Sequence, residues 1–391
     1  MDAYAKEIDE LLNEKSDSVR KREVSALDEL LASANHKIVL FGAGTLGVKA
    51  LRHLRSIGVE PLAFADNNPA RWGSGVDGVS ILSPSAAAEK FGGSAVFMVT
   101  IWSLGHSFRT TQEQLGGLGC RRVVSSDSLR WKFADQLLPD FCQDLPHKVF
   151  EQAEEVRAAA LLWADDYSRQ EYFNHLKWRT QGTLGALNPP DVEESYFLES
   201  LYSIVPGEVF VDCGAYDGDT VKQVIHRNGN FGRIFAIEAD PGNFHSLRKW
   251  AETVDPNIAS RIELCNVAVG ASRGQIRFNA TGGEGACISD DGDIVVDCLP
   301  IDEIAGKSAP TFIKMDIEGF EMEALKGSRE VIQKHRPILS ICVYHRQNDL
   351  WRVPLYIHSL VNDYRLYLRP HDVDGWQLVC YAVPPERLLT E

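Results

Sequence analysis

Two glycine-containing segments have the spacing of cofactor-binding loops, and they differ in charge. Residues 42–47 have the sequence Gly-Ala-Gly-Thr-Leu-Gly, which contains no acid and fits the G-x-G-x-x-G dinucleotide pattern. Residues 212–219 have the sequence Asp-Cys-Gly-Ala-Tyr-Asp-Gly-Asp, in which three acids flank the glycines. A pyrophosphate would be repelled by these acids. The second segment therefore favours a cofactor that carries positive charge.

An acid that could bind a ribose follows each segment after about 20 residues. Glu238 follows the second segment, at the end of a predicted strand. S-adenosylmethionine has a sulfonium, an ammonium and a ribose but no phosphate, so the pattern predicts a site for it. Gly214 and Gly218 would allow its close approach, Asp212 would lie near the ammonium group, and Glu238 would bind the ribose. A purely structural strand-to-helix turn would also explain the glycines taken alone.

A third group of polar residues follows two later strands. Asp316 and Glu318 lie in the sequence Lys-Met-Asp-Ile-Glu-Gly-Phe-Glu at 314–321, and His345 follows the next strand. A carboxylate or imidazole could align an acceptor hydroxyl and take its proton during methyl transfer. Alternatively, Asp316 and Glu318 cap the next helix, Glu321 is a solvent-exposed acid of its first turn, and His345 is a core residue bonded to a backbone carbonyl.

No metal site is predicted. Asp316, Glu318 and His345 could form a two-carboxylate, one-histidine centre, but no other residues supply further ligand spacing. The eight cysteines include no Cys-x-x-Cys pair, which argues against a zinc knuckle and a disulfide framework and is consistent with a reducing cytoplasm.

The N-terminal elements predict a small parallel sheet. Apolar residues at helical spacing within 1–35 indicate amphipathic helices that could pack against the domain or support a homo-oligomer. A strand at 38–41, a helix to about residue 57 and a strand at 61–65 form a β-α-β unit. Two more strands, at 96–100 and 122–125, flank a predicted helix within 103–118.

The C-terminal part predicts a larger, seven-stranded sheet, with an inserted hairpin at 276–296. Its strands are expected at 209–211, 234–237, 262–264, 312–316, 338–344, 365–369 and 377–382. The fold class is therefore α/β with two Rossmann-like units. We predict N-terminal helices at 1–35, a small Rossmann-like nucleotide or nucleotide-sugar domain at 36–137, a linker at 138–150 and a methyltransferase domain at 151–391.

Composition restricts the partners. The 391 residues carry a formal net charge of −15, which disfavours nucleic acid as the main partner. The N-terminus lacks an apolar signal core and no apolar run reaches the length of a membrane span, so a soluble cytoplasmic protein is expected.

Four sequence blocks of the C-terminal part resemble the FkbM family of S-adenosylmethionine-dependent methyltransferases. The blocks lie at 209–220, 235–241, 312–327 and 342–351, with a further match at 367–369. The resemblance implies a Rossmann-like methyltransferase fold and methyl transfer, usually to a hydroxyl on surface glycans or secondary metabolites. Many relatives have Leu-Arg-His-aromatic where this chain has Leu-Arg-Pro-His at 368–371, so no substrate role is assigned to His371.

Several site residues follow from this resemblance, position by position. It implies that Glu238 and its neighbour Ala239 bind the cofactor, and that residues 316–319 are the motif of the fourth strand. The cofactor loop comprises Asp212, Gly214, Ala215, Tyr216 and Gly218.

The N-terminal part has a shorter resemblance to the nucleotide-binding domain of sialic-acid-type sugar O-acyltransferases. It covers the glycine loop, residues 63–69 and residues 78–84. The implied ligand is a nucleotide sugar or dinucleotide, and a domain that only packs or dimerises remains an alternative. The residues of this predicted site are Gly42, Gly44, Gly47 and Asp66.

Together these patterns predict an S-adenosylmethionine-dependent O-methyltransferase acting on a sugar, glycan or glycosylated metabolite. One alternative is an NAD(P)-dependent oxidoreductase of a nucleotide sugar that uses residues 42–47, although no hydride-transfer constellation is recognisable. The other alternative is a non-catalytic nucleotide-sugar binding protein.

Overall fold

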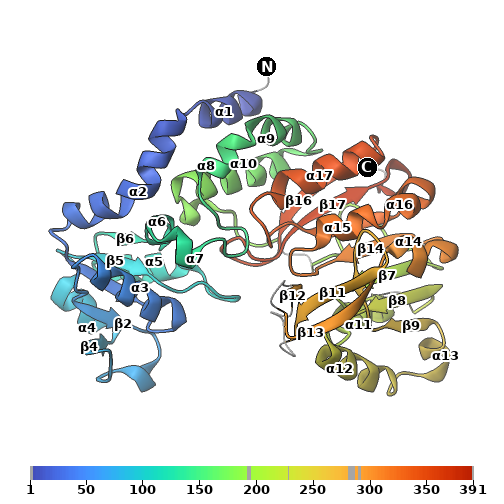
Figure 1. The fold of residues 1–391 in the computed structure, drawn as a ribbon, viewed down its shortest axis with the longest axis horizontal. Helices are drawn as coiled ribbons and strands as arrows, with labels where there is room; N and C mark the ends of the chain where they lie inside the picture. Colours follow the sequence, from blue (N-terminus) through green and yellow to red (C-terminus); the bar gives the residue numbers. More distant parts are fainter. Residues whose placement is uncertain (1–2, 192–194, 228, 281–286, 289–291, 390–391) are drawn as a thin grey trace. The chain divides into compact units, whose positions relative to one another are not determined.

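The chain forms two compact units. The structure, a computed structural model, describes residues 3–191, 195–227, 229–280, 287–288 and 292–389 (Figure 1). Unit 1 comprises Met1–Ala153, Phe173–Pro189 and Asp372–Trp376, and unit 2 comprises Glu154–Tyr172, Pro190–His371 and Gln377–Glu391. Each unit is described by itself.

Unit 1 contains a six-stranded, mostly parallel sheet, as the β-α-β pattern predicts (Figure 1). The strand order is β3-β4-β2-β1-β5-β6, and only the β3–β4 pair is antiparallel. The short strands β3 and β4 extend the four strands expected from the sequence. The strands are β1 (Ile38–Phe41), β2 (Ala63–Ala65), β3 (Gly75–Val76), β4 (Val79–Leu82), β5 (Val96–Val99) and β6 (Val123–Val124).

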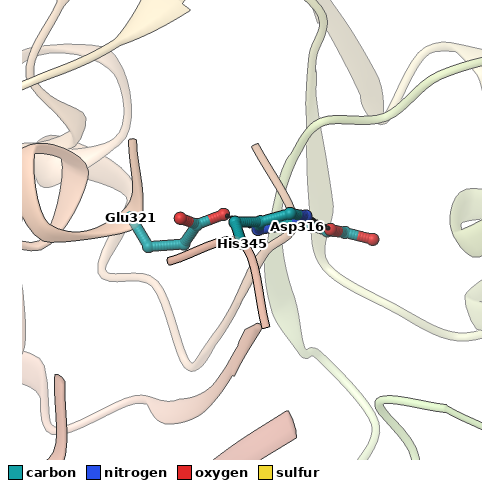
Figure 2. A group of neighbouring side chains, drawn as sticks. All are labelled: Asp316, Glu321 and His345. Atoms are coloured by element: carbon teal, nitrogen blue, oxygen red, sulfur yellow. Dashed lines mark hydrogen bonds and ion pairs between the residues drawn. The ribbon is translucent and has the colours of Figure 1, made fainter. Parts of the chain in front are cut away.

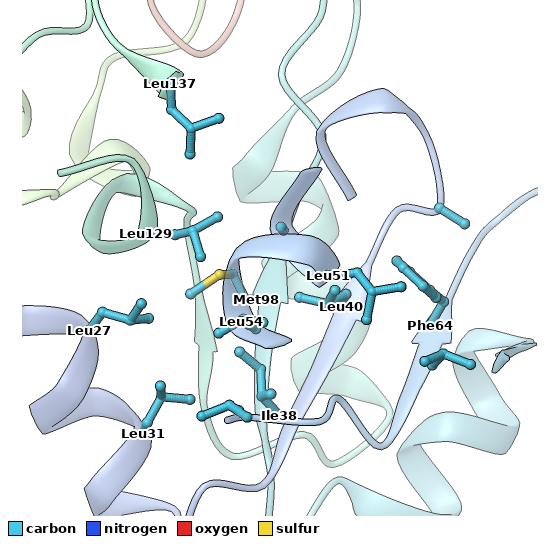
Figure 3. Packing of buried hydrophobic residues seen from close by; sticks show 14 of the residues in the cluster. Leu27, Leu31, Ile38, Leu40, Leu51, Leu54, Phe64, Met98, Leu129 and Leu137 are labelled. Atoms are coloured by element: carbon cyan, nitrogen blue, oxygen red, sulfur yellow. The ribbon is translucent and has the colours of Figure 1, made fainter. Parts of the chain in front are cut away.

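Helices cover both faces of this sheet because its central strand is apolar on both sides. Ile38 and Leu40 of β1 belong to one buried cluster, and Val39 and Phe41 belong to the other. Alternating side chains of a strand point to opposite faces, so a wholly apolar strand must be covered on each. Figure 3 shows the first cluster, to which α2 and α3 contribute leucines; α4 and α5 contribute to the second. The helices are α1 (Ala3–Leu12), α2 (Ser16–Ser33), α3 (Thr45–Ser56), α4 (Pro84–Phe91), α5 (Phe108–Gly117), α6 (Asp127–Lys132), α7 (Ala134–Leu137) and α8 (His147–Glu151).

Unit 2 contains the predicted seven-stranded sheet, in the order β16-β17-β15-β14-β7-β8-β9. Strand β17 is antiparallel to both neighbours, and the remaining pairs are parallel. Because parallel strands share their carboxyl edge, the loops after β7, β8, β14 and β15 lie along one edge of the sheet. The strands are β7 (Val209–Cys213), β8 (Arg233–Ile237), β9 (Ile262–Cys265), β14 (Phe312–Met315), β15 (Ile338–Cys342), β16 (Arg365–Pro370) and β17 (Leu378–Val383).

A second, four-stranded sheet of unit 2 contains the predicted hairpin. Strands β11 and β13 pair antiparallel, which confirms the hairpin, and β10 and β12 flank them. The glycine-rich and aspartate-rich turns at 282–285 and 290–291 lie outside the described residues. The strands are β10 (Ala268–Val269), β11 (Gly274–Asn279), β12 (Cys287–Ile288) and β13 (Ile294–Leu299).

The helices of unit 2 follow its strands in the expected alternation. No helix among the described residues is both long and apolar enough to cross a membrane. The remaining helices of the chain are α9 (Ala153–Ala160), α10 (Asp166–Gln181), α11 (Asp219–Arg227), α12 (Pro241–Ala251), α13 (Pro256–Ala259), α14 (Ile301–Ile304), α15 (Glu321–Lys326), α16 (Arg329–His335) and α17 (Asp349–Leu360).

The compact units differ from the predicted domain ranges. Residues 138–150, expected to be a linker, lie inside unit 1, and the chain crosses between the units within α10. The ranges of the functional domains remain predictions.

Candidate active site

The turn after β7 is shaped by two glycines with positive φ. Gly214 has φ +81°, and a Cβ atom there would lie 1.9 Å from the backbone oxygen of Asp316. Gly218 has φ +90°, and its Cβ would lie 2.8 Å from the Trp250 ring. Any side chain at position 214 would therefore displace the end of β14. The backbone of the glycine loop therefore contacts the backbone of Asp316, which begins the acid-containing segment at 316–321.

Glu238, directly after β8, is bonded to this loop. Its carboxylate accepts hydrogen bonds from the backbone N–H of Tyr216 at 2.9 Å and of Asp240 at 2.7 Å. Tyr216 itself has φ +47°. The next predicted cofactor residue, Ala239, accepts a hydrogen bond at its backbone oxygen from the side-chain amide of Asn266 at 3.4 Å. Burial raises the pKa of Glu238. Each carboxylate oxygen has a second lone pair that could accept a ribose hydroxyl.

Asp212 is paired with a buried lysine. Lys314 occupies the matching position on the neighbouring strand β14, and its Nζ lies 3.0 Å from Asp212 Oδ1. Nζ also donates to the backbone oxygen of Gly214 at 2.7 Å. Burial raises the pKa of Asp212 to about 7. Burial alone would lower the pKa of Lys314, but the charges of Asp212, Asp316 and Asp219 raise it.

Lys314 is a site residue that the sequence analysis did not assign. The available signal was a lysine within the otherwise apolar strand Phe-Ile-Lys-Met at 312–315. A buried lysine needs an acidic partner, and the register of β7 and β14 supplies Asp212. Sequence reasoning placed Asp212 near the cofactor's ammonium group without providing for this internal ammonium.

Asp316 lies at the carboxyl end of β14 among donors. The Tyr196 hydroxyl donates to Oδ2 at 2.7 Å, and the Tyr344 hydroxyl donates to Oδ1 at 3.3 Å. The Nε2 atom of His345 also lies 3.3 Å from Oδ1. Although burial alone would raise it, His345, Lys314 and Tyr196 hold the pKa of Asp316 below its ordinary value. Asp316 is therefore kept ionised.

His345 lies between carboxylates on both sides of its ring (Figure 2). Its Nδ1 is 2.8 Å from Glu321 Oε1, and its Nε2 is 3.8 Å from Glu318 Oε2. Glu318 has φ +55° and a side chain that is 23% exposed. Burial alone would lower the pKa of His345, but the charges of Glu321, Asp316 and Glu318 raise it to about 10. The structure thus brings the three predicted residues together.

The expectation that Glu321 is a solvent-exposed helical acid is wrong. The residue is 0% exposed. Its carboxylate points inward, where it accepts the backbone N–H of Ile317 at 2.9 Å and bonds His345. His345 is buried as the core alternative proposed, but its ring nitrogens face the carboxylates of Glu321, Asp316 and Glu318.

Asp316, Glu321 and His345 are close enough to raise the question of a metal ion. In Figure 2, however, the imidazole ring lies between the two carboxylates. An ion bound to one ring nitrogen at about 2 Å would be separated by the ring from the carboxylate at the other. This arrangement, with one carboxylate beside each ring nitrogen, fits ion pairs to a charged imidazole better than the coordination shell of one ion.

His371 lies elsewhere on this unit's sheet. Its Nε2 is 2.7 Å from the Tyr381 hydroxyl, which accepts the backbone N–H of Tyr196 at 2.9 Å. His371 is therefore linked to Tyr196, a neighbour of Asp316, through the Tyr381 hydroxyl.

In the N-terminal glycine loop at 42–47, as in the second loop, an acid at the end of the next strand accepts backbone N–H groups. Asp66 accepts the backbone N–H of Ala43 at 2.9 Å and of Asn68 at 2.8 Å. The guanidinium of Arg71, which sequence reasoning missed, donates to the backbone oxygen of Ala43 at 2.6 Å. A Cβ at Gly47 would lie 2.0 Å from the backbone oxygen of Gly42.

The remaining two glycines of this loop differ from each other. Gly42 has φ +106°, and a Cβ there would lie 2.4 Å from the Ile101 side chain. A Cβ at Gly44 would have no atom within 4 Å. The first and third glycines of the pattern are therefore required by packing, whereas the second has free space beside it.

Comparison with known proteins identifies the C-terminal part. The family model described as the methyltransferase FkbM domain matches residues 212–372. A crystal structure of methyltransferase FkbM from Methylobacillus flagellatus KT is similar over nearly the whole chain. The two sequences are 27% identical, the match covers 97% of this chain and 98% of that chain, and the TM-score is 0.75.

Two further solved structures match parts of the chain with TM-scores below 0.5, so they are too dissimilar to support a conclusion about this protein. UDP-D-quinovosamine 4-dehydrogenase from Vibrio fischeri is 23% identical over 23% of this chain and 75% of its own, with a TM-score of 0.20. A methyltransferase from Geobacter sulfurreducens is 16% identical over 64% of this chain and 93% of its own, with a TM-score of 0.28. No curated protein matches the chain. Residues 212–372 thus form a methyltransferase domain of the FkbM family, and the chain is an S-adenosylmethionine-dependent methyltransferase.

Proposed function

We propose that the chain transfers a methyl group to a hydroxyl of a sugar, glycan or glycosylated metabolite. One observation carries the proposal. The loop at 214–218 contacts the segment that holds Asp316, Glu318 and Glu321, since a Cβ at Gly214 would lie 1.9 Å from the backbone oxygen of Asp316. Methyl transfer to oxygen needs the donor, the acceptor hydroxyl and a proton acceptor within one small region. This contact supports such a region at the carboxyl edge of the unit 2 sheet.

The residues around the loop fit S-adenosylmethionine. The loop of Gly214, Ala215, Tyr216 and Gly218 leaves the backbone open to a close ligand, and the lone pairs of Glu238 suit a ribose diol. The cofactor supplies an activated methyl group on a positively charged sulfur. Asp212 contributes to the negative environment of the loop while its pairing with Lys314 fixes the loop on β14.

We assign acceptor binding and proton removal to Asp316, Glu318 and His345. Asp316 is held ionised by its neighbours, so its carboxylate can accept the proton of an acceptor hydroxyl. Glu318, with a partly exposed side chain, can bind a second hydroxyl of a sugar. His345, with its raised pKa, supplies positive charge beside both carboxylates and helps to keep Asp316 ionised.

For the N-terminal unit we propose a nucleotide or nucleotide-sugar site at Gly42, Gly44, Gly47 and Asp66. Arg71 beside the loop favours a phosphate-containing ligand because it offers positive charge there. Bound ligand would let this unit present the acceptor. An oxidoreductase using this loop, or a non-catalytic binding unit, would be distinguished by titration with NADH and with uridine diphosphate sugars.

A role in glycan biosynthesis in the cytoplasm is the setting that we infer. Seven cysteines in the described part of the chain are free, which is consistent with a reducing compartment. The net charge of −15 supports a sugar-type acceptor over nucleic acid. The N-terminal helices could support a homo-oligomer.

Incubation with S-adenosylmethionine labelled on its methyl group tests the proposal. Nucleotide sugars, oligosaccharides and glycosylated small molecules would be offered, with products analysed by mass spectrometry. We expect a mass gain of one methylene unit on a sugar hydroxyl, and its loss with Asp316→Asn. Methylation that occurs only on nitrogen, carbon or a carboxyl group would contradict the proposal.

A further inference from the structure

The buried carboxylate of Glu321 has a role that neither the family match nor the predicted site assigns. We propose that Glu321 is a positioning residue, which holds His345 charged and oriented so that the ring faces Asp316 and Glu318. The effect of Glu321 on proton removal rests on the proposed function of Asp316 as proton acceptor. The effect of Glu321 on the charge and orientation of His345 does not depend on that function.

The contacts fix the orientation of the ring. Glu321 Oε1 lies 2.8 Å from His345 Nδ1, while Nε2 on the opposite side faces Asp316 at 3.3 Å. Figure 2 shows the three side chains in that order. With a proton on Nδ1 donated to Glu321, the ring can present only Nε2 to the site.

Burial makes this contact strong. Glu321 is 0% exposed, and the side chain of His345 is 2% exposed. A carboxylate at this depth is costly unless a positive charge or donors accompany it. The backbone N–H groups of Ile317 at 2.9 Å and Gly319 at 3.5 Å donate to Oε1, and His345 is the contact of Glu321 that can carry a positive charge, so Glu321 gains most from a charged imidazole.

The groups around His345 come from several elements and are mainly acidic. Lys314 of β14 and Arg346 supply positive charge nearby, and the Tyr344 ring lies 4.1 Å from the imidazole, centroid to centroid. Burial, together with the charge of Glu321, raises the pKa of Asp349 to about 7, although His345 and Arg346 act to lower it. The acids facing this region are Asp316, Glu318, Glu321 and Asp349.

A purely structural role for Glu321 makes a different prediction. If Glu321 only bound the N–H of Ile317 to support the turn before α15, its replacement would lower stability without changing the protonation of His345. Glu321→Gln keeps the shape and an oxygen that can accept both bonds, but removes the charge. Glu323→Gln is the matched control, because Glu323 lies on the same helix but pairs with Lys326 near the surface.

Nuclear magnetic resonance of histidine-labelled full-length protein tests the proposal directly, with the His345 signal assigned from His345→Asn. In wild type we expect His345 to remain charged at pH 8, and Glu321→Gln to lower its pKa by about 2 units while Glu323→Gln leaves it unchanged. If Glu321→Gln fails to fold, Glu321→Asp takes its place: it keeps the charge but moves it away from Nδ1, and should lower the pKa of His345 by less than about 2 units. A wild-type His345 that is neutral at pH 8, or an unchanged pKa in Glu321→Gln, would overturn the proposal.

Methyl transfer by the same variants separates this inference from the proposed function. With Glu321→Gln, the alkaline limb of the kcat profile should move to lower pH, because the lowered pKa of His345 makes the ring lose at lower pH the charge that it places beside the Asp316 carboxylate. The KM for S-adenosylmethionine should stay near wild type. A shifted His345 pKa with an unmoved kcat profile would retain the role of Glu321 toward His345 and reject that of Asp316 as proton acceptor.

Discussion

The two glycine loops share one backbone design and differ in the strand beside them. In both, the acid that follows the second strand accepts two backbone N–H groups, one from the loop and one from the residue two positions after the acid itself. These acids are Asp66 in unit 1 and Glu238 in unit 2. Thr100 directly follows the neighbouring strand β5 of unit 1, and its hydroxyl donates to the backbone oxygen of Gly42 at 2.9 Å. In unit 2 the corresponding neighbour is β14, which supplies Lys314 and Asp316.

This difference separates the residues that build a turn from those that perform chemistry. Glycines and a strand-end acid that accepts a loop N–H occur in both units, so they cannot by themselves distinguish a catalytic loop from a binding or structural one. Beside the first loop, Thr100 contacts the backbone oxygens of Phe41 and Gly42 through a neutral hydroxyl, where β14 of unit 2 brings the charged Lys314 and Asp316. The chemistry of unit 2 therefore depends on the strand next to its loop.

Removing the positive-φ glycine of the second loop should have the largest effect. Gly214→Ala adds a Cβ 1.9 Å from the Asp316 oxygen at φ +81°, so we expect loss of S-adenosylhomocysteine binding and destabilisation by at least about 2 kcal/mol. Gly47→Ala, with its Cβ 2.0 Å from the Gly42 oxygen, should also destabilise but leave that binding intact in the folded fraction. Thermal unfolding and calorimetry measure the two effects. Equal loss of binding in both variants would contradict the separation of roles.

Asp316→Asn should reduce kcat by about 100-fold to 1000-fold, because it removes the proposed proton acceptor. Glu318→Gln and His345→Ala should also lower turnover. Affinity for S-adenosylhomocysteine should remain near wild type in all three variants. Single-turnover kinetics and calorimetry make the comparison, and loss of cofactor binding would assign these residues a structural role.

Lys314→Met should destabilise the protein by about 3 kcal/mol or more, since Asp212 then remains buried without its partner. The folded pKa of Asp212, about 7, is above its unfolded value, so its contribution to stability is present in acid and is lost as the pH rises through 7. Without Lys314 this pKa rises further, and the deficit should be greater at pH 8 than at pH 5.5.

Thr100→Val is the matched change beside the first loop. It removes a neutral hydroxyl, and should cost about 1 kcal/mol with no dependence on pH. Urea unfolding of both variants at the two pH values provides the test. A deficit of Lys314→Met that is the same at both pH values would contradict the buried pair.

Removal of divalent ions should have the smallest effect. Because the His345 ring lies between Asp316 and Glu321, we expect activity after treatment with a chelator to stay within about twofold of the untreated enzyme. Rescue of a chelated, inactive enzyme by magnesium or zinc would instead support a metal-bound acceptor.

Much of the fold could be predicted from periodicity, because the strands are short apolar runs that end at glycines or acids. All seven strands of the unit 2 sheet were expected. In unit 1, β3 has only two residues, and β4, although as long as β1, has only two buried residues and so lacks a continuous apolar run. The pairing of Lys314 with Asp212 depends on strand register, and the burial of Glu321 depends on His345 arriving from another strand. Such contacts between distant segments are absent from local sequence patterns.

The most direct test of the central claim is calorimetric titration of S-adenosylhomocysteine into wild type, Glu238→Ala and Asp66→Ala, with NADH titrated in parallel. These two acids hold equivalent places in the two loops, so each variant is the control for the other. We predict binding with a dissociation constant in the micromolar range (about −8 kcal/mol) to wild type and Asp66→Ala, and its loss in Glu238→Ala. Absence of S-adenosylhomocysteine binding, or its loss in Asp66→Ala with retention in Glu238→Ala, would contradict the assignment of the methyltransferase site to unit 2.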